Sequence, residues 1–163
     1  MYLFDSDVLI KAKNLHYSFD VVPGFWDWLD AKFGVGEVGS VERVRDELVS
    51  GNDELARWIA QRRNRFAGAT PAMANSLKSV TYWATSQQFT PAALQKFLSS
   101  ADLHLIAFAH AHNHVVVTHE KSEPGARKAI KIPDVCLAFK VDCIGPFEMM
   151  RRESVRLVLG ANS

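Results

Sequence analysis

The sequence contains few cysteines and no arrangement of them that would build a metal framework. Its two cysteines, Cys136 and Cys143, do not form a C-x-x-C pair. A zinc site of the usual cysteine-rich type is therefore not expected. This sparse cysteine content is also typical of proteins from a reducing compartment, so we expect a cytoplasmic protein.

Long hydrophobic runs and a strong excess of charge are also missing. No apolar run reaches the length needed to span a bilayer, and the first residues do not combine a basic stretch with a long apolar one. These absences predict a soluble protein with no membrane partner. The net charge is only +1, so a nucleic-acid partner would have to be met by a local basic patch. There is no internal repeat or low-complexity tract.

The length and the order of the hydrophobic patterns predict one α/β domain over residues 1–163. Short apolar strands are expected at 2–4, 35–40, 114–118 and 141–143. Helices are expected from Val8 onward and at 23–33, 41–50, 53–68, 70–89, 90–100, 101–112, 134–140 and 145–154, with Ser40 as the N-cap of the third. Alternating strands and helices predict a short, mostly parallel central sheet between two helical layers, a three-layer α/β/α sandwich.

Acidic residues occur where the strands of such a sheet end. In "YLFDSDVLI", Asp5 and Asp7 come directly after the first strand, and Glu120 follows the strongest strand, "HVVVT". Asp102 opens a helix that is apolar almost all round, and Glu47 flanks the apolar face of its helix. Ligand sites in parallel sheets form at the carboxyl ends of the strands. Several carboxylates there are the ligands that a hard divalent cation requires.

Each of these acids also has an ordinary structural explanation that the sequence leaves open. The alternatives are an N-cap pair for Asp5 and Asp7, a surface ion pair with Arg43 for Glu47, a favourable helix dipole for Asp102 and a solvated loop for Glu120.

Four motifs in order resemble the PIN-domain (PilT N-terminus) nucleases. They are "YLFDSDVLI", the helix "VERVRDELVSG", the helix start "SSADLHLIAFA" and the strand end "VVVTHE". His119-Glu120 stands where that family more often has Asn-Asp. A small branch that pairs "VVTHE" with "KIPDVC" and a closing "FEMMR"-like helix is the nearest match.

This resemblance implies a PIN-like fold and metal-dependent hydrolysis of RNA. Asp5, Glu47, Asp102 and Glu120 would hold one or two Mg²⁺ or Mn²⁺ ions, which would activate a water molecule and neutralise charge on the phosphate. The products would end in a 5′-phosphate and a 3′-hydroxyl. Many relatives are toxins of toxin–antitoxin pairs, so an antitoxin protein and a homodimer are implied as partners.

Further residues are expected to support the site or bind substrate. The supporting candidates are Ser6, Asp7, Thr118, His119 and Asp134. A basic loop, which a solvated surface would explain equally well, supplies the candidates for phosphate contacts: Lys121, Arg127, Lys128 and Lys131.

Other functions also fit parts of the sequence. One alternative is a haloacid dehalogenase-like phosphatase with Asp5 as nucleophile, although no strand precedes the acids of "IPDVCLAFKVD". Others are a catalytically degenerate PIN-like module that binds RNA or protein, and a structural protein without a site. The His110-x-His112-x-His114 spacing does not predict a metal site, because helix residues two apart do not share a face.

Overall fold

The central sheet is parallel throughout. The computed structural model describes residues 1–158, so the last five residues of the expected domain lie outside the described part. Within it, a five-stranded sheet has the order β3-β2-β1-β4-β5. The strands are β1 (Tyr2–Phe4), β2 (Val38–Val41), β3 (Phe66–Ala67), β4 (Val115–Val117) and β5 (Cys143–Ile144). The predicted α/β/α fold class is confirmed.

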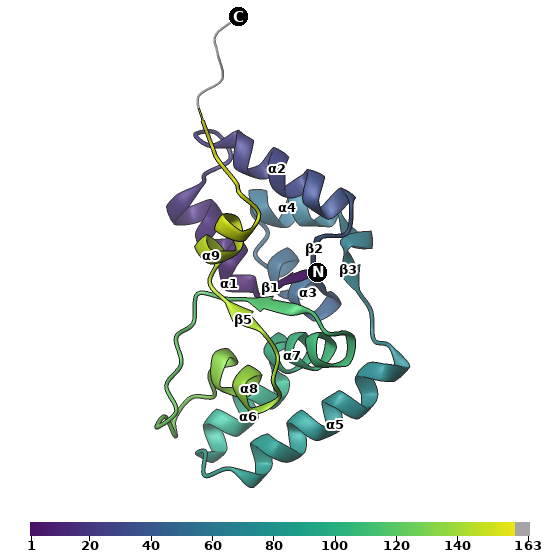
Figure 1. Ribbon diagram of the computed structural model, residues 1–163, viewed down its shortest axis with the longest axis vertical. Helices are drawn as coiled ribbons and strands as arrows, with labels where there is room; N and C mark the ends of the chain where they lie inside the picture. Colours follow the sequence, from purple (N-terminus) through teal and green to yellow (C-terminus); the bar gives the residue numbers. More distant parts are fainter. Residues whose placement is uncertain (159–163) are drawn as a thin grey trace, which may run out of the picture.

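Helices cover both faces of this sheet (Figure 1). They are α1 (Ser6–Lys11), α2 (Pro23–Gly34), α3 (Glu42–Ser50), α4 (Glu54–Ala60), α5 (Pro71–Ser86), α6 (Pro91–Ser99), α7 (Ala101–His112), α8 (Ile132–Ala138) and α9 (Pro146–Arg152). In Figure 1, α2, α4 and α9 lie on one side of the strands and α5, α6, α7 and α8 on the other. No helix among residues 1–158 combines the length and the hydropathy that crossing a membrane would require.

Helix α7 forms the centre of the core, as its continuous apolar sequence predicts. Leu105, Ile106 and Ala107 have no exposed surface. On the side of α7 that faces α5, the ring of His110 lies 2.8 Å from the Ser76 hydroxyl. The ring of His112 makes a similar contact to Thr70 at 2.9 Å. These two histidines therefore join α7 to α5.

Two local predictions are wrong. Ser40 does not cap α3, because it lies inside β2 and its hydroxyl donates to the Phe4 carbonyl at 2.6 Å. The helix expected over 53–68 ends at Ala60 and is followed by a 3₁₀ turn (η2, Arg63–Arg65) and then β3. Arg62, just after α4, pairs with Asp30 on α2 at 2.6 Å.

Glycine in the middle of β2 allows a close approach between neighbouring strands. A Cβ atom at Gly39 would lie 3.1 Å from the Arg65 carbonyl oxygen and 3.3 Å from the Met1 sulfur. The backbone oxygen cannot move aside without disturbing the pairing of β2 with β3.

We therefore expect Gly39→Val to lower the free energy of unfolding by about 1–3 kcal/mol, the usual cost of overpacking. Urea titration followed by tryptophan fluorescence measures this change. Gly24→Ala in α2 is the control, because a Cβ atom there meets nothing within 4 Å. Equal stability of the two variants would show that the close approach imposes no constraint.

Candidate functional site

The strand order reverses between β1 and β4, since β2 and β3 continue on one side and β5 on the other. In open parallel sheets a ligand crevice forms at such a point, outside the carboxyl ends of the two strands. Asp5 follows β1 here, and its backbone N–H donates to the Val117 carbonyl at 3.1 Å. Thr118 and Glu120 follow β4. The predicted location of the acids at the strand ends is therefore observed for this pair of strands.

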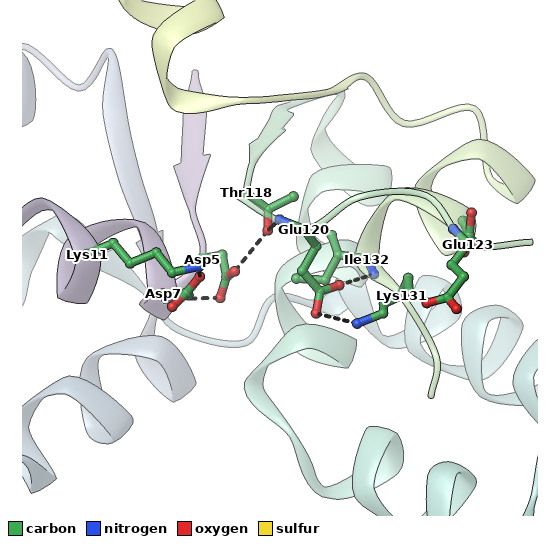
Figure 2. A network of polar contacts seen from close by, with 9 residues as sticks. Asp5, Asp7, Lys11, Thr118, Glu120, Glu123, Lys131 and Ile132 are labelled. Carbon is green, nitrogen blue, oxygen red and sulfur yellow. Dashed lines mark hydrogen bonds and ion pairs between the residues drawn. The ribbon is translucent and has the colours of Figure 1, made fainter. Parts of the chain in front are cut away.

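Asp5 is the most buried of the candidate acids, with 6% of its surface exposed. Its Oδ2 accepts a hydrogen bond from the Thr118 hydroxyl at 2.9 Å, and Oδ1 accepts from the Asp7 backbone at 3.4 Å (Figure 2). Asp5 is thus the N-cap of α1 as well as a member of the acidic group. Burial raises the pKa of Asp5 to about 6, the charges of Asp7 and Glu120 also raise it, and the hydrogen bonds from Thr118 and Asp7 lower it.

Glu47 remains exposed on α3, and its carboxylate reaches the first residues of α1 and α7. One carboxylate oxygen accepts from the buried Ser6 hydroxyl at 2.6 Å. The other accepts from the Ala101 backbone N–H at 3.2 Å, at the first residue of α7. Neither oxygen is in an ion pair with Arg43, the alternative left open by the sequence. Glu47 therefore lies between the beginnings of α1 and α7.

Asp102 is the next residue after this contact, in the first turn of α7. Burial raises the pKa of Asp102 to about 7, and the charges of Asp5, Glu120 and Glu47 raise it further in that order. A carboxyl group can respond to three other carboxylates only if all of them lie near it. The four predicted acids, which come from four parts of the sequence, therefore share one region, which we call the acidic centre.

The charge of Glu120 acts on Asp5 and Asp102 in the acidic centre, but its carboxylate is hydrogen-bonded at the start of α8. Its Oε2 accepts from the Ile132 backbone N–H at 2.8 Å, and its Oε1 lies 3.9 Å from the Lys131 ammonium group (Figure 2). The backbone N–H of Glu120 also donates to the Thr118 hydroxyl at 3.1 Å. Thr118 consequently links Asp5 and Glu120 through a single side chain.

The other predicted supporting residues divide between the acidic centre and its surroundings. Asp7 lies beside Asp5 and forms an ion pair with Lys11 at 2.7 Å. Asp134 accepts instead from the Ser122 hydroxyl and the Glu123 backbone, so it orders the loop after β4 and has no contact with the acidic centre. His119 turns toward His16, with 5.8 Å between the ring centroids.

The basic loop after β4 presents most of its cations to solvent. Lys121, Arg127 and Lys128 are exposed, and none of them takes part in an ion pair with another of the described residues. Lys131 is the exception, because it lies against Glu120. The loop is anchored to the start of α6 by a hydrogen bond from the Thr90 backbone to the Arg127 carbonyl at 2.8 Å.

A further cation near the acidic centre gave no signal in the sequence. Lys96 on α6 acts on Asp102 and opposes the rise of its pKa. Its position depends on how α6 packs against α7, which a helical pattern alone does not specify.

A hollow of about 280 Å³ lies beside Glu47 and Ala101, and Arg43 also lines it.

The donor chemistry of the acidic centre fits a hard divalent cation, since all four side chains offer carboxylate oxygens and two of them have raised pKa values. In the arrangement seen over residues 1–158, however, no three acidic, histidine or cysteine side chains are grouped closely enough to hold a metal ion. The reason is that Glu47 and Glu120 accept hydrogen bonds at the starts of α7 and α8. Cation binding would require these two side chains to turn toward Asp5 and Asp102.

Comparison with known proteins gives one match. The family model described as "Domain of unknown function (DUF4411)" matches residues 2–157. No curated protein and no solved structure matches the chain.

The raised pKa of Asp102 predicts a pH-dependent stability. A pKa of about 7 in the folded protein, against about 4 in the unfolded chain, means that the folded state binds this proton more tightly. Ionised Asp102 therefore destabilises the fold above pH 7, and this penalty declines as the pH falls from 7 toward 4.

We expect Asp102→Asn to raise the melting temperature at pH 8, without divalent cations, by about 2–8 °C. The difference should shrink as the pH is lowered to 4, where Asp102 is protonated in the folded protein and about half protonated in the unfolded chain. Differential scanning calorimetry across this range measures the effect, and Asp20→Asn at an exposed loop position is the matched control. A lower melting temperature for Asp102→Asn at pH 8 would contradict the repulsion described here.

Proposed function

The chain belongs to the DUF4411 family, a domain of unknown function, and we propose that it is a Mg²⁺- or Mn²⁺-dependent ribonuclease of PIN type. The phosphodiester bond of RNA would be hydrolysed at the acidic centre. The resemblance of the four acidic motifs to the PIN-domain nucleases supports this proposal, and RNA, an antitoxin protein and a homodimeric partner come from that resemblance.

The observation that carries the proposal is the convergence of the four carboxylates, because Thr118 links Asp5 to Glu120 and Glu47 accepts from the residue before Asp102. Asp5, Glu47 and Glu120 each raise the pKa of Asp102, and Glu120 also raises that of Asp5. Like charges are brought together in this way at a cost in folding free energy. A divalent cation that binds between them removes that cost, which makes a cation-dependent function the simplest reason for the arrangement.

The surroundings of the acidic centre suit a polyanionic substrate. The loop that follows β4 exposes Lys121, Arg127 and Lys128. The positive charge of Lys96 on α6 lowers the pKa of Asp102. Cationic side chains of this kind position a nucleic-acid backbone without reading its sequence. The net charge of +1 is no obstacle, because a local group of cations is sufficient to contact a phosphate backbone.

The side chains of the acidic centre have separable roles in this proposal. Asp5, Glu47, Asp102 and Glu120 would hold the cation, which when bound would supply Lewis-acid activation of water and of the phosphate. Thr118 donates to Asp5 and so fixes the direction of its carboxylate. Ser6 does the same for Glu47.

The second acidic segment favours the nuclease over a phosphatase that uses Asp5 as nucleophile. Such a phosphatase would need a further acidic motif after a later strand. Asp134 of "IPDVCLAFKVD" lies instead in the first turn of α8 and accepts from the Ser122 hydroxyl and the Glu123 backbone. Asp142 of the same segment precedes β5.

The proposal is tested by Asp5→Asn in a cleavage assay with 5′-labelled single-stranded RNA and Mn²⁺. We expect the cleavage rate to fall by about 100-fold or more, because one of the groups that would stabilise the transition-state charge is lost. Asp20→Asn is the matched control and should cleave at the parental rate. Equal rates in the parent protein and in Asp5→Asn would refute the assignment of Asp5 to a nuclease site.

A smaller loss of cleavage activity is expected at Thr118, because it donates a hydrogen bond to Asp5 but is not one of the four carboxylates. Thr118→Val keeps the side-chain shape and removes the hydrogen bond to Asp5. We expect the cleavage rate to fall by about 10-fold and the Mn²⁺ concentration for half-maximal activity to rise, as for other residues that orient metal ligands. Thr118→Ser should restore most of the activity. An unchanged Mn²⁺ dependence in Thr118→Val would contradict the positioning role.

A further inference from the structure

Three rings meet next to Glu120 of the acidic centre. The His16 and His119 ring centroids are 5.8 Å apart, and Phe147 contacts His16 edge to face at 5.6 Å. His119 directly precedes Glu120 in the chain. Phe147 is 45% exposed, His16 is also exposed and His119 is half-buried, so part of the group is accessible from solvent. We call these three residues the ring platform.

An irregular turn of backbone creates the platform. The chain leaves α1 through a π-helical turn, η1 (Ala12–His16), and His16 is its last residue. The hydrogen bonds of a π-helical turn span five residues, whereas those of an α-helix span four. In an ordinary α-helix, residue 16 would therefore lie at a different position around the helix axis. Such single turns occur often at functional sites. The turn brings His16, which follows the first motif in the chain, against His119 of the fourth.

The space beneath the rings is nearly filled. Phe4, Val8, Phe25 and Met149 lie under the platform, and the cavity there measures only about 10 Å³, the space of one water molecule. A ligand ring therefore cannot enter below the platform and would have to lie on its exposed face.

Cationic groups flank the platform. Lys121, two residues after His119, is exposed on the basic loop, and Lys11 lies at the end of α1, directly before the π-helical turn that carries His16. Exposed aromatic faces next to cations are the combination by which proteins hold single-stranded nucleic acid, with bases on the rings and phosphates on the cations.

We propose that His16, His119 and Phe147 form a stacking site for one unpaired base of single-stranded RNA, next to the acidic centre. This inference deepens the proposed function and rests on it for the identity of the strand. A base on the platform would leave its neighbouring phosphate close to Glu120, because His119 and Glu120 are adjacent residues.

The test is equilibrium binding of a fluorescein-labelled ten-nucleotide single-stranded RNA, followed by fluorescence anisotropy in EDTA so that no cleavage occurs. We expect Phe147→Ala and His16→Ala to bind about 5- to 50-fold more weakly than the parent, and Phe147→Trp to bind as tightly as the parent. Tyr82→Ala, which removes a ring 76% exposed on α5, is the matched control and should bind normally.

An RNA of the same length made of abasic nucleotides distinguishes stacking from charge. The parent and Phe147→Ala should bind this strand equally, since it keeps the phosphates and lacks the bases. Parental affinity of both alanine variants for the ordinary strand would overturn the inference. An equal loss on both strands would overturn it as well, because the effect would then come from the fold or from charge.

The same measurements separate this inference from the proposed function. Asp5→Asn should keep the binding and lose the cleavage. If the ring variants lose base-dependent binding while the parent does not cleave RNA with Mn²⁺, the ribonuclease proposal fails and the platform stands. If Asp5→Asn abolishes cleavage while both ring variants bind normally, the platform fails and the ribonuclease proposal stands.

Discussion

The repulsion among the carboxylates of the acidic centre is the constraint on which the surrounding structure depends. Asp5 and Asp102 are held away from bulk water beside Glu47 and Glu120, so their negative charges are poorly screened. The fold compensates with donors that each come from a different element. Thr118 donates to Asp5, Ser6 and the Ala101 backbone donate to Glu47, and the Ile132 backbone donates to Glu120. Two of these donors are at helix starts, where backbone N–H groups lack partners of their own.

Much of this arrangement follows from short-range patterns in the sequence. The apolar runs "YLF" and "HVVVT" predicted β1 and β4, a strand expected over 35–40 overlaps β2 (Val38–Val41), and the alternation of strands with helices predicted the parallel sheet. Once the sheet is parallel, Asp5 and Glu120 must lie at the same edge, because both directly follow strands. The position of the acidic centre was therefore accessible without coordinates.

Other features depend on contacts between distant segments and were missed for that reason. β3 has two residues, which is too short to show a periodic pattern. Ser40 has the chemistry of an N-cap, yet its hydroxyl finds the Phe4 carbonyl in the next strand. The π-helical turn before Tyr17 has no residue signature. Asp134 has the position of a helix-start acid, and tertiary packing directs it to the loop after β4.

The position of Glu47 joins two layers of the molecule through one side chain. One of its oxygens accepts from the Ser6 hydroxyl at the beginning of α1, and the other accepts from the Ala101 backbone N–H at the beginning of α7. If a positive ion drew this carboxylate inward, both helices would lose an acceptor at once. The vacated N–H of Ala101 would then be free to exchange its hydrogen with solvent. Ion binding and opening of the helix starts would thus be coupled equilibria. A rotation of the Glu47 side chain alone would change the hydrogen bonding at the beginnings of both helices.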